Sequence, residues 1–315
     1  MSGKYVYFAP TGGFADLLAR TNMWRKFCHR QKRTLLLDTS KTMYRINFNK
    51  YFDISGPVIT DTDLIDKIVE DTSLTKFPTN FDFDKLKKNK YIFTSLDKKR
   101  YFREGKEGAK FLMPKEPKLI EDCPQALEKD IIVTISNGGG SWDIEQGLCS
   151  LTFKKDFGDE IKNEYIEKKN LVGSDYLCLH VRNTDYTSNY INFYNKYKEK
   201  IHSYAHIYIC TDNPEVIDFF VSKKLNVYNF TTFPDDSGHI ENVDFYKCKK
   251  PKALPLHHSN IDGRRQLKDL LIDMSFAADS TEFLPARRSG GYVLLCLRTK
   301  NKLKSSVIDF LHESK

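Results

Sequence analysis

Short apolar runs that end in glycine turns or in polar residues recur along this chain, and they predict strands buried inside parallel sheets. Near the N-terminus, residues 4–10 and 33–38 predict two such strands, and residues 14–30 between them predict a helix with one apolar side. Residues 130–136 predict a further strand, which runs into the glycines at 138–140. The strand–helix–strand order indicates a βαβ unit.

A second series of the same kind follows a charged, helix-compatible segment at residues 154–169, the candidate join between domains. The strands and helices predicted after it lie at residues 176–181, 206–211, 214–223, 226–230, 266–278, 282–285 and 303–312. We therefore expect an α/β protein with two Rossmann-like domains, residues 1–160 and residues 161–315, that face a central cleft.

The composition is that of a soluble globular protein with more than one core. The chain has 315 residues, of which 40% are hydrophobic and 29% are charged. Because no apolar run approaches the ~20 residues of a membrane span and the N-terminus lacks a secretory apolar region, we expect a cytoplasmic protein. Seven cysteines are scattered without a Cys-x-x-Cys pair, which argues against a disulfide framework and against a zinc site.

The net charge of +8 favours anionic partners, such as nucleotides, phosphorylated glycans or an acidic membrane surface. Nucleic acid is disfavoured as a partner, because the 50 basic residues are dispersed among 42 acidic ones and no aromatic-basic recognition module is present. The lysine-rich runs at 85–90 and 247–252 are interpreted as solvated surface, with peripheral membrane contact as the alternative.

The segment Leu177 to Tyr186 carries the sharpest candidate chemistry. Its apolar run breaks into His180, Arg182 and Asp185, as expected for a buried strand that ends at a sheet edge. In open α/β sheets, ligands bind at the carboxyl ends of the strands, and the planar fork of an arginine suits a phosphate. The alternative is an ion pair between Arg182 and Asp185 that closes a loop.

Glycine and serine turns supply further candidates for binding a phosphate. Gly12 and Gly13 lie between a predicted strand and a helix, and Ser289 and Gly290 lie in the sequence Arg-Arg-Ser-Gly-Gly-Tyr. Such turns allow backbone N–H groups at a helix N-terminus to approach an anion. For the glycines, the alternative is an ordinary strand-to-helix turn. For the serine, the alternative is a helix cap, and the Thr-Asp-Asn sequence at 211–213 is also interpreted as a helix cap.

Together these segments resemble the fucosyltransferase superfamily of α1,6-fucosyltransferases, nodulation fucosyltransferases and protein O-fucosyltransferases. The sequence His-Val-Arg-Asn-Thr-Asp at 180–185 matches the HxRxxD motif of that family. The resemblance implies a GT-B fold in which Arg182 binds the β-phosphate of the donor, Asp185 supports that arginine and His180 lies near the donor.

Later segments resemble two further family elements in the same order. Asp273 corresponds to a helix aspartate that contacts the nucleoside, and Ser289, followed by Gly290, corresponds to a serine that holds a phosphate. Gly12 and Gly13 are similar to the first glycine loop of the family. These residues, with Arg182, form the expected donor site.

The resemblance implies an inverting, metal-independent transfer of a sugar from a nucleotide diphosphate to a glycan, with GDP-fucose as the first-choice donor and no cofactor. Arg182, Ser289 and helix N-termini would take the place of a metal, and the Asp-Phe-Asp sequence at 82–84 is interpreted as a surface turn. Asp16 is the preferred general base, with Asp38 and His180 as alternatives.

Three other functions remain open from the sequence. The donor could be a different nucleotide sugar, such as a UDP-sugar, or the chain could be a non-catalytic module that binds a glycan or a nucleotide. The third, a basic protein associated with nucleic acid, would show a steep dependence of affinity on salt.

Overall fold

The chain folds into two compact units in the computed structural model, Met1–Thr152 and Phe153–Lys315. The residues that the structure describes are 3–10, 14–41, 46–79, 81–83, 91–96, 99–104, 110–112, 117–136, 151–182, 188–233 and 262–286. The predicted boundary between residues 160 and 161 falls inside helix α7 (Lys155–Val172), which belongs entirely to the second unit.

A five-stranded parallel sheet with the order β4-β2-β1-β9-β5 forms the centre of the first unit. Its strands are β1 (Tyr5–Pro10), β2 (Thr34–Leu37), β4 (Val58–Ile59), β5 (Lys76–Phe77) and β9 (Ile131–Ser136). The three predicted strands, β1, β2 and β9, are confirmed and lie at the centre. The two-residue edge strands are too short to produce a hydrophobic pattern, so the sequence alone did not predict them.

Helices cover both faces of this sheet. Helix α1 (Phe14–Arg30), at its predicted bounds, packs on one face together with α4 (Pro117–Glu121) and α5 (Pro124–Glu128), where Trp24 and Phe27 are fully buried. Helix α2 (Thr62–Glu70) packs on the other face through Ile65, Ile68 and Val69. Burial on both faces explains why β1 is apolar throughout instead of alternating.

Smaller elements complete the first unit. Two 3-10 helices, η1 (Thr39–Lys41) and η2 (Phe48–Lys50), follow β2, and strand β3 (Phe52–Ile54) pairs with β10 (Leu151–Phe153). A separate antiparallel sheet consists of β6 (Tyr91–Leu96), β7 (Lys99–Glu104) and β8 (Lys110–Leu112).

The buried side chain of Arg33 ties the start of the first sheet together. Its guanidinium donates hydrogen bonds to four backbone carbonyl oxygens, those of Tyr5, Leu127, Lys129 and Asp130. A buried charge is costly unless its hydrogen-bonding groups are satisfied, and these carbonyls satisfy them. Arg33 therefore links β1 to the segment that leads into β9.

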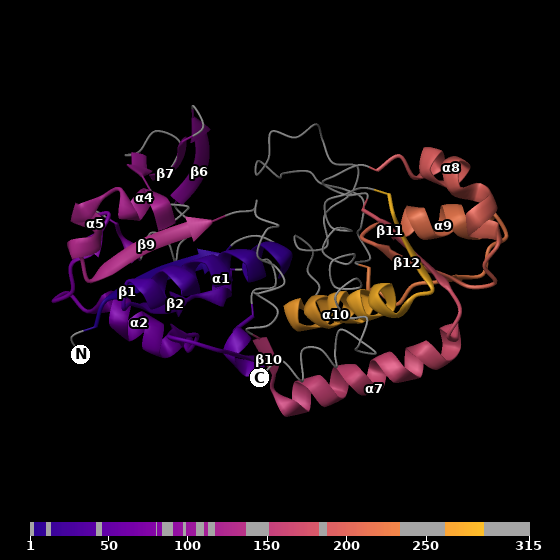
Figure 1. Cartoon of the computed structure of the whole chain (residues 1–315), viewed down its shortest axis with the longest axis horizontal. Coiled ribbons are helices and arrows are strands. Elements are labelled where there is room, and N and C mark those ends of the chain that lie inside the picture. Colours follow the sequence, from indigo (N-terminus) through magenta and orange to yellow (C-terminus); the bar gives the residue numbers. More distant parts are fainter. Residues whose placement is uncertain are drawn as a thin grey trace. The chain divides into compact units, whose positions relative to one another are not determined.

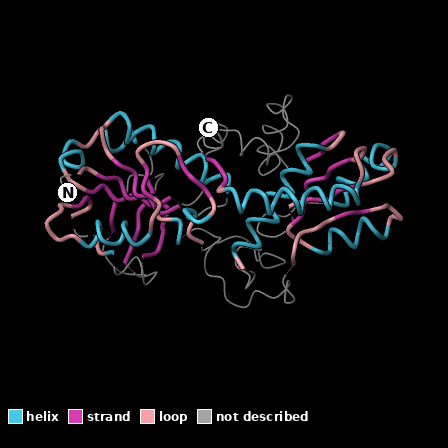
Figure 2. Tube along the Cα trace, turned by 90° about the horizontal axis from the view of Figure 1, so that it is seen from below, coloured by secondary structure: helices cyan, strands magenta, loops and turns pink. Residues whose placement is uncertain are grey.

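A four-stranded parallel sheet with the order β13-β12-β11-β14 forms the second unit. Its strands are β11 (Leu177–Val181), β12 (Ile207–Thr211), β13 (Val227–Tyr228) and β14 (Glu282–Pro285). Figure 2 shows the strands of each parallel sheet with helices on both sides of them. All four strands were predicted, and the parallel pairing brings their carboxyl ends to one edge.

Helices lie on both faces of the second sheet (Figure 1). Helices α8 (Tyr190–His202) and α9 (Pro214–Ser222) pack on the face formed by Leu177, Leu179 and Val181 of β11. Helix α10 (Gly263–Asp279) covers the opposite face, where Phe276 stacks on Tyr208 with ring centroids 4.0 Å apart. Helix α8 was not predicted, because its buried aromatic residues are separated by a largely polar sequence.

Helix α7 packs against α10 through a network of ion pairs. Glu160 pairs with Arg264 and with Lys268, and Glu164 pairs with Lys168 and Lys268. Burial alone would raise the pKa of Glu164, but the hydrogen bonds from the two lysines outweigh it and lower that pKa to about 2.

In the part of the chain that the structure describes, no helix is long and apolar enough to cross a membrane.

Candidate functional site

The carboxyl ends of β11 and β12 place a basic and an acidic side chain next to each other. Val181 is in register with Thr211, so Arg182 and Asp212 each follow directly after paired strand ends. The Nε atom of Arg182 lies 3.6 Å from Oδ2 of Asp212. The Arg182 side chain is 31% exposed and that of Asp212 is 20% exposed. The arginine is thus held in place by a neighbouring strand while part of it still reaches solvent.

The expected partner of Arg182 in a loop-closing ion pair was Asp185, which lies outside the described residues. Among the described residues, Asp212 pairs with Arg182. The sequence favoured a helix cap for the Thr-Asp-Asn segment that contains Asp212, and the same segment also resembles a strand-end Thr-Asp segment of the fucosyltransferase superfamily. Asn213 makes that cap, because its side-chain oxygen accepts a hydrogen bond from the backbone N–H of Glu215 at 2.9 Å. The available signal for Asp212 was its position directly after a strand of the same parallel sheet.

His180 lies on β11 two residues before Arg182, with its side chain on the α10 face of the sheet. Among the described residues, its buried Nδ1 atom has no hydrogen-bond partner. Burial lowers the pKa of His180 to about 4, and the positive charge of Arg182 contributes in the same direction. The imidazole is therefore neutral at pH 7, so the positive charge at the end of β11 resides on Arg182.

Asp273 lies between α10 and β12 and receives hydrogen bonds at both carboxylate oxygens. The Tyr208 hydroxyl donates to Oδ1 at 2.6 Å, and the Thr231 hydroxyl donates to Oδ2 at 3.1 Å. Burial raises the pKa of Asp273 to about 7, although these two hydrogen bonds act against the increase. Near neutral pH, the carboxyl is therefore divided between its protonated and ionised forms.

Tyr208 and Thr231 are partners that sequence reasoning missed. The pattern placed Asp273 on the flank of a helix, but it could not show which strand that flank faces. The structure thus brings His180, Arg182 and Asp212 together at the sheet edge, and it groups Asp273 with Tyr208 and Thr231.

Two carboxylates of the first unit were candidates for the general base. Asp16 lies in the first turn of α1, directly after the carboxyl end of β1. Asp38 follows β2, and its carboxylate accepts hydrogen bonds from the Tyr7 hydroxyl at 2.6 Å and from the backbone N–H of Ser40 at 3.0 Å. Burial raises the pKa of Tyr7, and the charge of Asp38 raises it further, so this phenol remains a donor.

The remaining site predictions fall on residues outside the described ranges, namely Gly12, Gly13, Asp185, Ser289 and Gly290. For Gly12 and Gly13, the flanking elements are where the pattern predicted them, since β1 ends at Pro10 and α1 begins at Phe14.

The part of the chain that the structure describes contains no cluster of three or more histidine, cysteine, aspartate or glutamate side chains that could hold a metal ion. Cys28, Cys178 and Cys210 are buried free thiols, as expected for core residues, and Cys123 is partly buried.

The fold of the chain is similar to that of solved fucosyltransferase structures. No protein-family model matches the chain, and no curated protein matches its sequence. The crystal structure of the α1,6-fucosyltransferase NodZ soaked with GDP-fucose matches with a TM-score of 0.55 at 16% sequence identity, covering 94% of this chain and 91% of NodZ. NodZ co-crystallised with GDP and NodZ from Bradyrhizobium each match with a TM-score of 0.53 at 16% identity, covering 95% of this chain and 92% of NodZ. The expected GT-B type of α/β fold is thereby confirmed.

Proposed function

We propose that the chain is a glycosyltransferase that moves fucose from GDP-fucose to a glycan acceptor. The observation that carries the proposal is the position of Arg182, which Asp212 holds at the carboxyl edge of the second sheet. This edge is where ligands bind in open α/β sheets, and the fold is similar to that of NodZ, which was soaked with GDP-fucose. In this proposal, residues 161–315 bind the donor and residues 1–160 bind the acceptor.

The proposed chemistry depends on stabilising the leaving nucleotide. As the bond between the anomeric carbon and the β-phosphate oxygen breaks, positive charge develops on the sugar and negative charge on the phosphate. The Arg182 guanidinium supplies charge-assisted hydrogen bonds to that phosphate, and Asp212 keeps the arginine oriented for them. Ser289, Gly290, Gly12 and Gly13 provide further donors in this proposal, and Asp273 provides a contact for the nucleoside.

Attack by the acceptor hydroxyl from the opposite side inverts the anomeric centre, and a general base removes its proton. Asp16 is the proposed base because it lies in the first turn of α1, at the carboxyl edge of the first sheet. Asp38 is less suited to this role, since its carboxylate already accepts hydrogen bonds from Tyr7 and Ser40. His180, whose imidazole is neutral at pH 7, is the third candidate for the general base.

The proposed transfer needs no metal, because a cationic side chain and backbone N–H groups stabilise the charge of the phosphate. We therefore expect the rate of transfer to stay the same when EDTA is added to the assay. The measurement is the initial rate of GDP release with EDTA and again with added Mn²⁺. Strong inhibition by EDTA that Mn²⁺ reverses would show that the metal-free proposal is wrong.

A thermal-shift panel with GDP, UDP, ADP and CMP and their common sugars tests the donor. A ligand that binds only the folded state raises the melting temperature by mass action. We expect GDP and GDP-fucose to raise it in the wild type and to raise it much less in Arg182→Ala. A shift with UDP instead of GDP would replace fucosyl transfer with transfer from a UDP-sugar. GDP-fucose that binds without turnover in the presence of glycans would favour the non-catalytic module.

A further inference from the structure

Tyr208 of β12 is a buried phenol that contacts Asp273 of the expected donor site but has no part in the transfer described so far. Its side chain is fully buried. The ring stacks on Phe276 of α10, with an angle of 11° between the ring planes, and it meets Tyr176 edge to face with ring centroids 6.5 Å apart. Packing on these two sides fixes the ring, so its hydroxyl group is a donor with a defined position.

Two donors hold the carboxylate of Asp273, one at each oxygen. The Tyr208 hydroxyl donates to Oδ1 at 2.6 Å, and the Thr231 hydroxyl donates to Oδ2 at 3.1 Å. Burial raises the pKa of Tyr208, and the charge of Asp273 raises it further, so the phenol stays a donor at neutral pH. An ionised carboxylate can accept about four hydrogen bonds, so two donors from the protein leave acceptor positions for a ligand.

Thr231 connects this carboxylate to the edge of the sheet where ligands are expected. It comes after the end of β13, and the next residue, Thr232, donates its backbone N–H to Oδ2 of Asp269 at 2.8 Å. The segment after β13 is therefore fastened to α10. Thr231 and Asp273 are both partly exposed, whereas Tyr208 is fully buried. The carboxylate thus has a buried donor on one side and a donor near the surface on the other.

The charged and titratable groups around Asp273 act in opposite directions. The charge of Asp269, one turn earlier on α10, raises the pKa of Asp273, and Lys168 of α7 lowers it. From β12, the Cys210 thiol donates to the backbone oxygen of Asp273 at 3.6 Å, and burial raises the pKa of that thiol. His180 of β11 is in register with Cys210, and its imidazole is neutral at pH 7. Since burial favours the neutral carboxyl, the two hydroxyl donors are the hydrogen-bonding groups that favour its ionised form.

We propose that Tyr208 is a positioning residue of the donor site, whose hydrogen bond holds the Asp273 carboxylate ionised and oriented to accept two N–H groups of the donor base. This inference rests on the proposed function, in which Asp273 contacts the nucleoside of GDP-fucose. Guanine carries two neighbouring donors, N1–H and the amino group at C2, and one carboxylate can accept from both. A base that lacks one of them leaves an acceptor of the site unpaired and binds more weakly. Tyr208 thereby contributes to the choice of base without touching the nucleotide.

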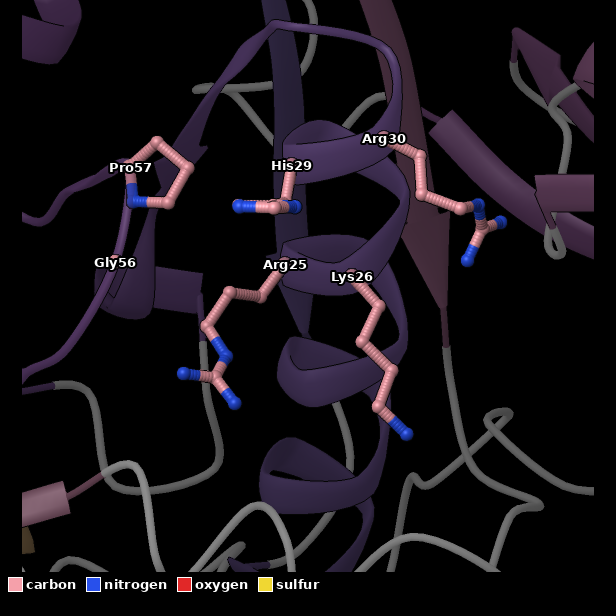
Figure 3. Close-up of a pocket in the computed structure, with 6 residues that line it drawn as sticks. All are labelled: Arg25, Lys26, His29, Arg30, Gly56 and Pro57. Atoms are coloured by element: carbon pink, nitrogen blue, oxygen red, sulfur yellow. The ribbon is translucent and has the colours of Figure 1, made fainter.

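Basic side chains also gather around a hollow of about 330 Å³ on the first unit (Figure 3). The hollow is lined by Arg25, Lys26, His29, Arg30, Gly56 and Pro57. Arg30 points away from the opposite wall and pairs with Glu121 at 3.0 Å. The Arg25 guanidinium donates to the side chains of Asn22 and Ser55. Because protein groups already pair with these two arginines, the proposed nucleotide site is placed on the second unit.

The first test is the ¹³C NMR titration of the Asp273 carboxyl group in the full chain, with its signal assigned by its absence in Asp273→Asn. Tyr208→Phe keeps the stacked ring and should move the titration midpoint about one pH unit higher, because a hydrogen bond to the ionised form is lost. Thr231→Val, which removes the other donor, should move it in the same direction. Tyr176→Phe is the matched control, since it removes a buried hydroxyl that donates to the backbone oxygen of Phe276 instead, and it should leave the midpoint unchanged.

The second test is the affinity for GDP of the same variants, measured by isothermal titration calorimetry from pH 6 to 9. Tyr208→Phe should bind GDP about tenfold more weakly than wild type at pH 6, because one pH unit in the midpoint changes the ionised fraction about tenfold. The loss should shrink towards pH 9, where the carboxyl is ionised in both proteins. The ratio of the two affinities cancels the titration of the nucleotide itself. The preference for GDP over IDP, whose base lacks the amino group at C2, should also shrink in Tyr208→Phe and stay as in wild type in Tyr176→Phe.

Four outcomes would overturn the proposal. The first two are an unchanged carboxyl midpoint in Tyr208→Phe and an equal change of midpoint in Tyr176→Phe. The third is a loss of GDP affinity that is the same at every pH, which would reduce Tyr208 to a packing role. The fourth is a shifted midpoint with unchanged GDP affinity, which would show that the base binds elsewhere. If no nucleotide binds to wild type, the proposed function is wrong and the assignment to a donor base fails with it, whereas the carboxyl titration still decides whether Tyr208 controls the ionisation of Asp273.

Discussion

Arg182→Ala should lower the rate of sugar transfer by ~10²- to 10³-fold, by analogy with the loss of one donor to a developing oxyanion. The side chain lies at the carboxyl edge of the second sheet beside Asp212, and 31% of it is exposed. It is outside the buried cores, so its removal should leave the melting temperature nearly unchanged. The measurement is kcat for GDP release at saturating donor and acceptor, with thermal unfolding of the same sample.

Arg182→Lys should also lose most of the activity, although it keeps the positive charge. A lysine is a point charge that cannot make two parallel hydrogen bonds to one phosphate. Arg264→Lys, on α10 where Arg264 pairs with Glu160 of α7, is the matched control and should keep the wild-type rate. Equal activity of Arg182→Ala and wild type would remove Arg182 from the mechanism, and full activity of Arg182→Lys would reduce its role to charge alone.

Asp273→Asn should become progressively more stable than wild type as the pH rises from 4 to 7. Burial raises the pKa of Asp273 to about 7 in the folded protein, against 3.8 in an unperturbed chain. Below pH 4, the carboxyl is protonated in both states. Between pH 4 and 7, it ionises only in the unfolded chain, so wild type loses stability, and above pH 7 the loss is complete. The full difference should reach as much as ~4 kcal/mol, because each pKa unit corresponds to ~1.4 kcal/mol.

Asparagine suits this test because it carries no titrating proton and has the same shape as a protonated aspartate. Its side-chain oxygen can still accept from the Tyr208 hydroxyl, and its amide group can donate to the Thr231 hydroxyl. The measurement is the difference in unfolding free energy between variant and wild type at each pH, which cancels the titration of all other groups. Asp218→Asn, on the exposed surface of α9, is the control, and an identical pH profile for both variants would contradict the prediction.

The apolar runs predicted the central strands of both sheets, because a strand covered on both faces must be apolar along its whole length. This rule located β1, β2 and β9 in the first unit and β11 and β12 in the second. The same rule located the candidate site, since Arg182 comes directly after one of these runs. Short edge strands such as β4 and the largely polar helix α8 lack a continuous pattern, so they became visible only once the elements packed together.

The sequence by itself determined an α/β fold, the succession along the chain of its central strands and of most of its long helices, and the placement of Arg182 at the end of a buried strand. Only the tertiary structure decided which side chains meet. Asp212 reaches Arg182 because β11 and β12 pair in parallel register, although 30 residues separate them along the chain. Asp273 meets Tyr208 because α10 covers that face of β12. Local patterns record how far each element is buried, whereas contacts between distant elements depend on strand order and register, which no local pattern contains.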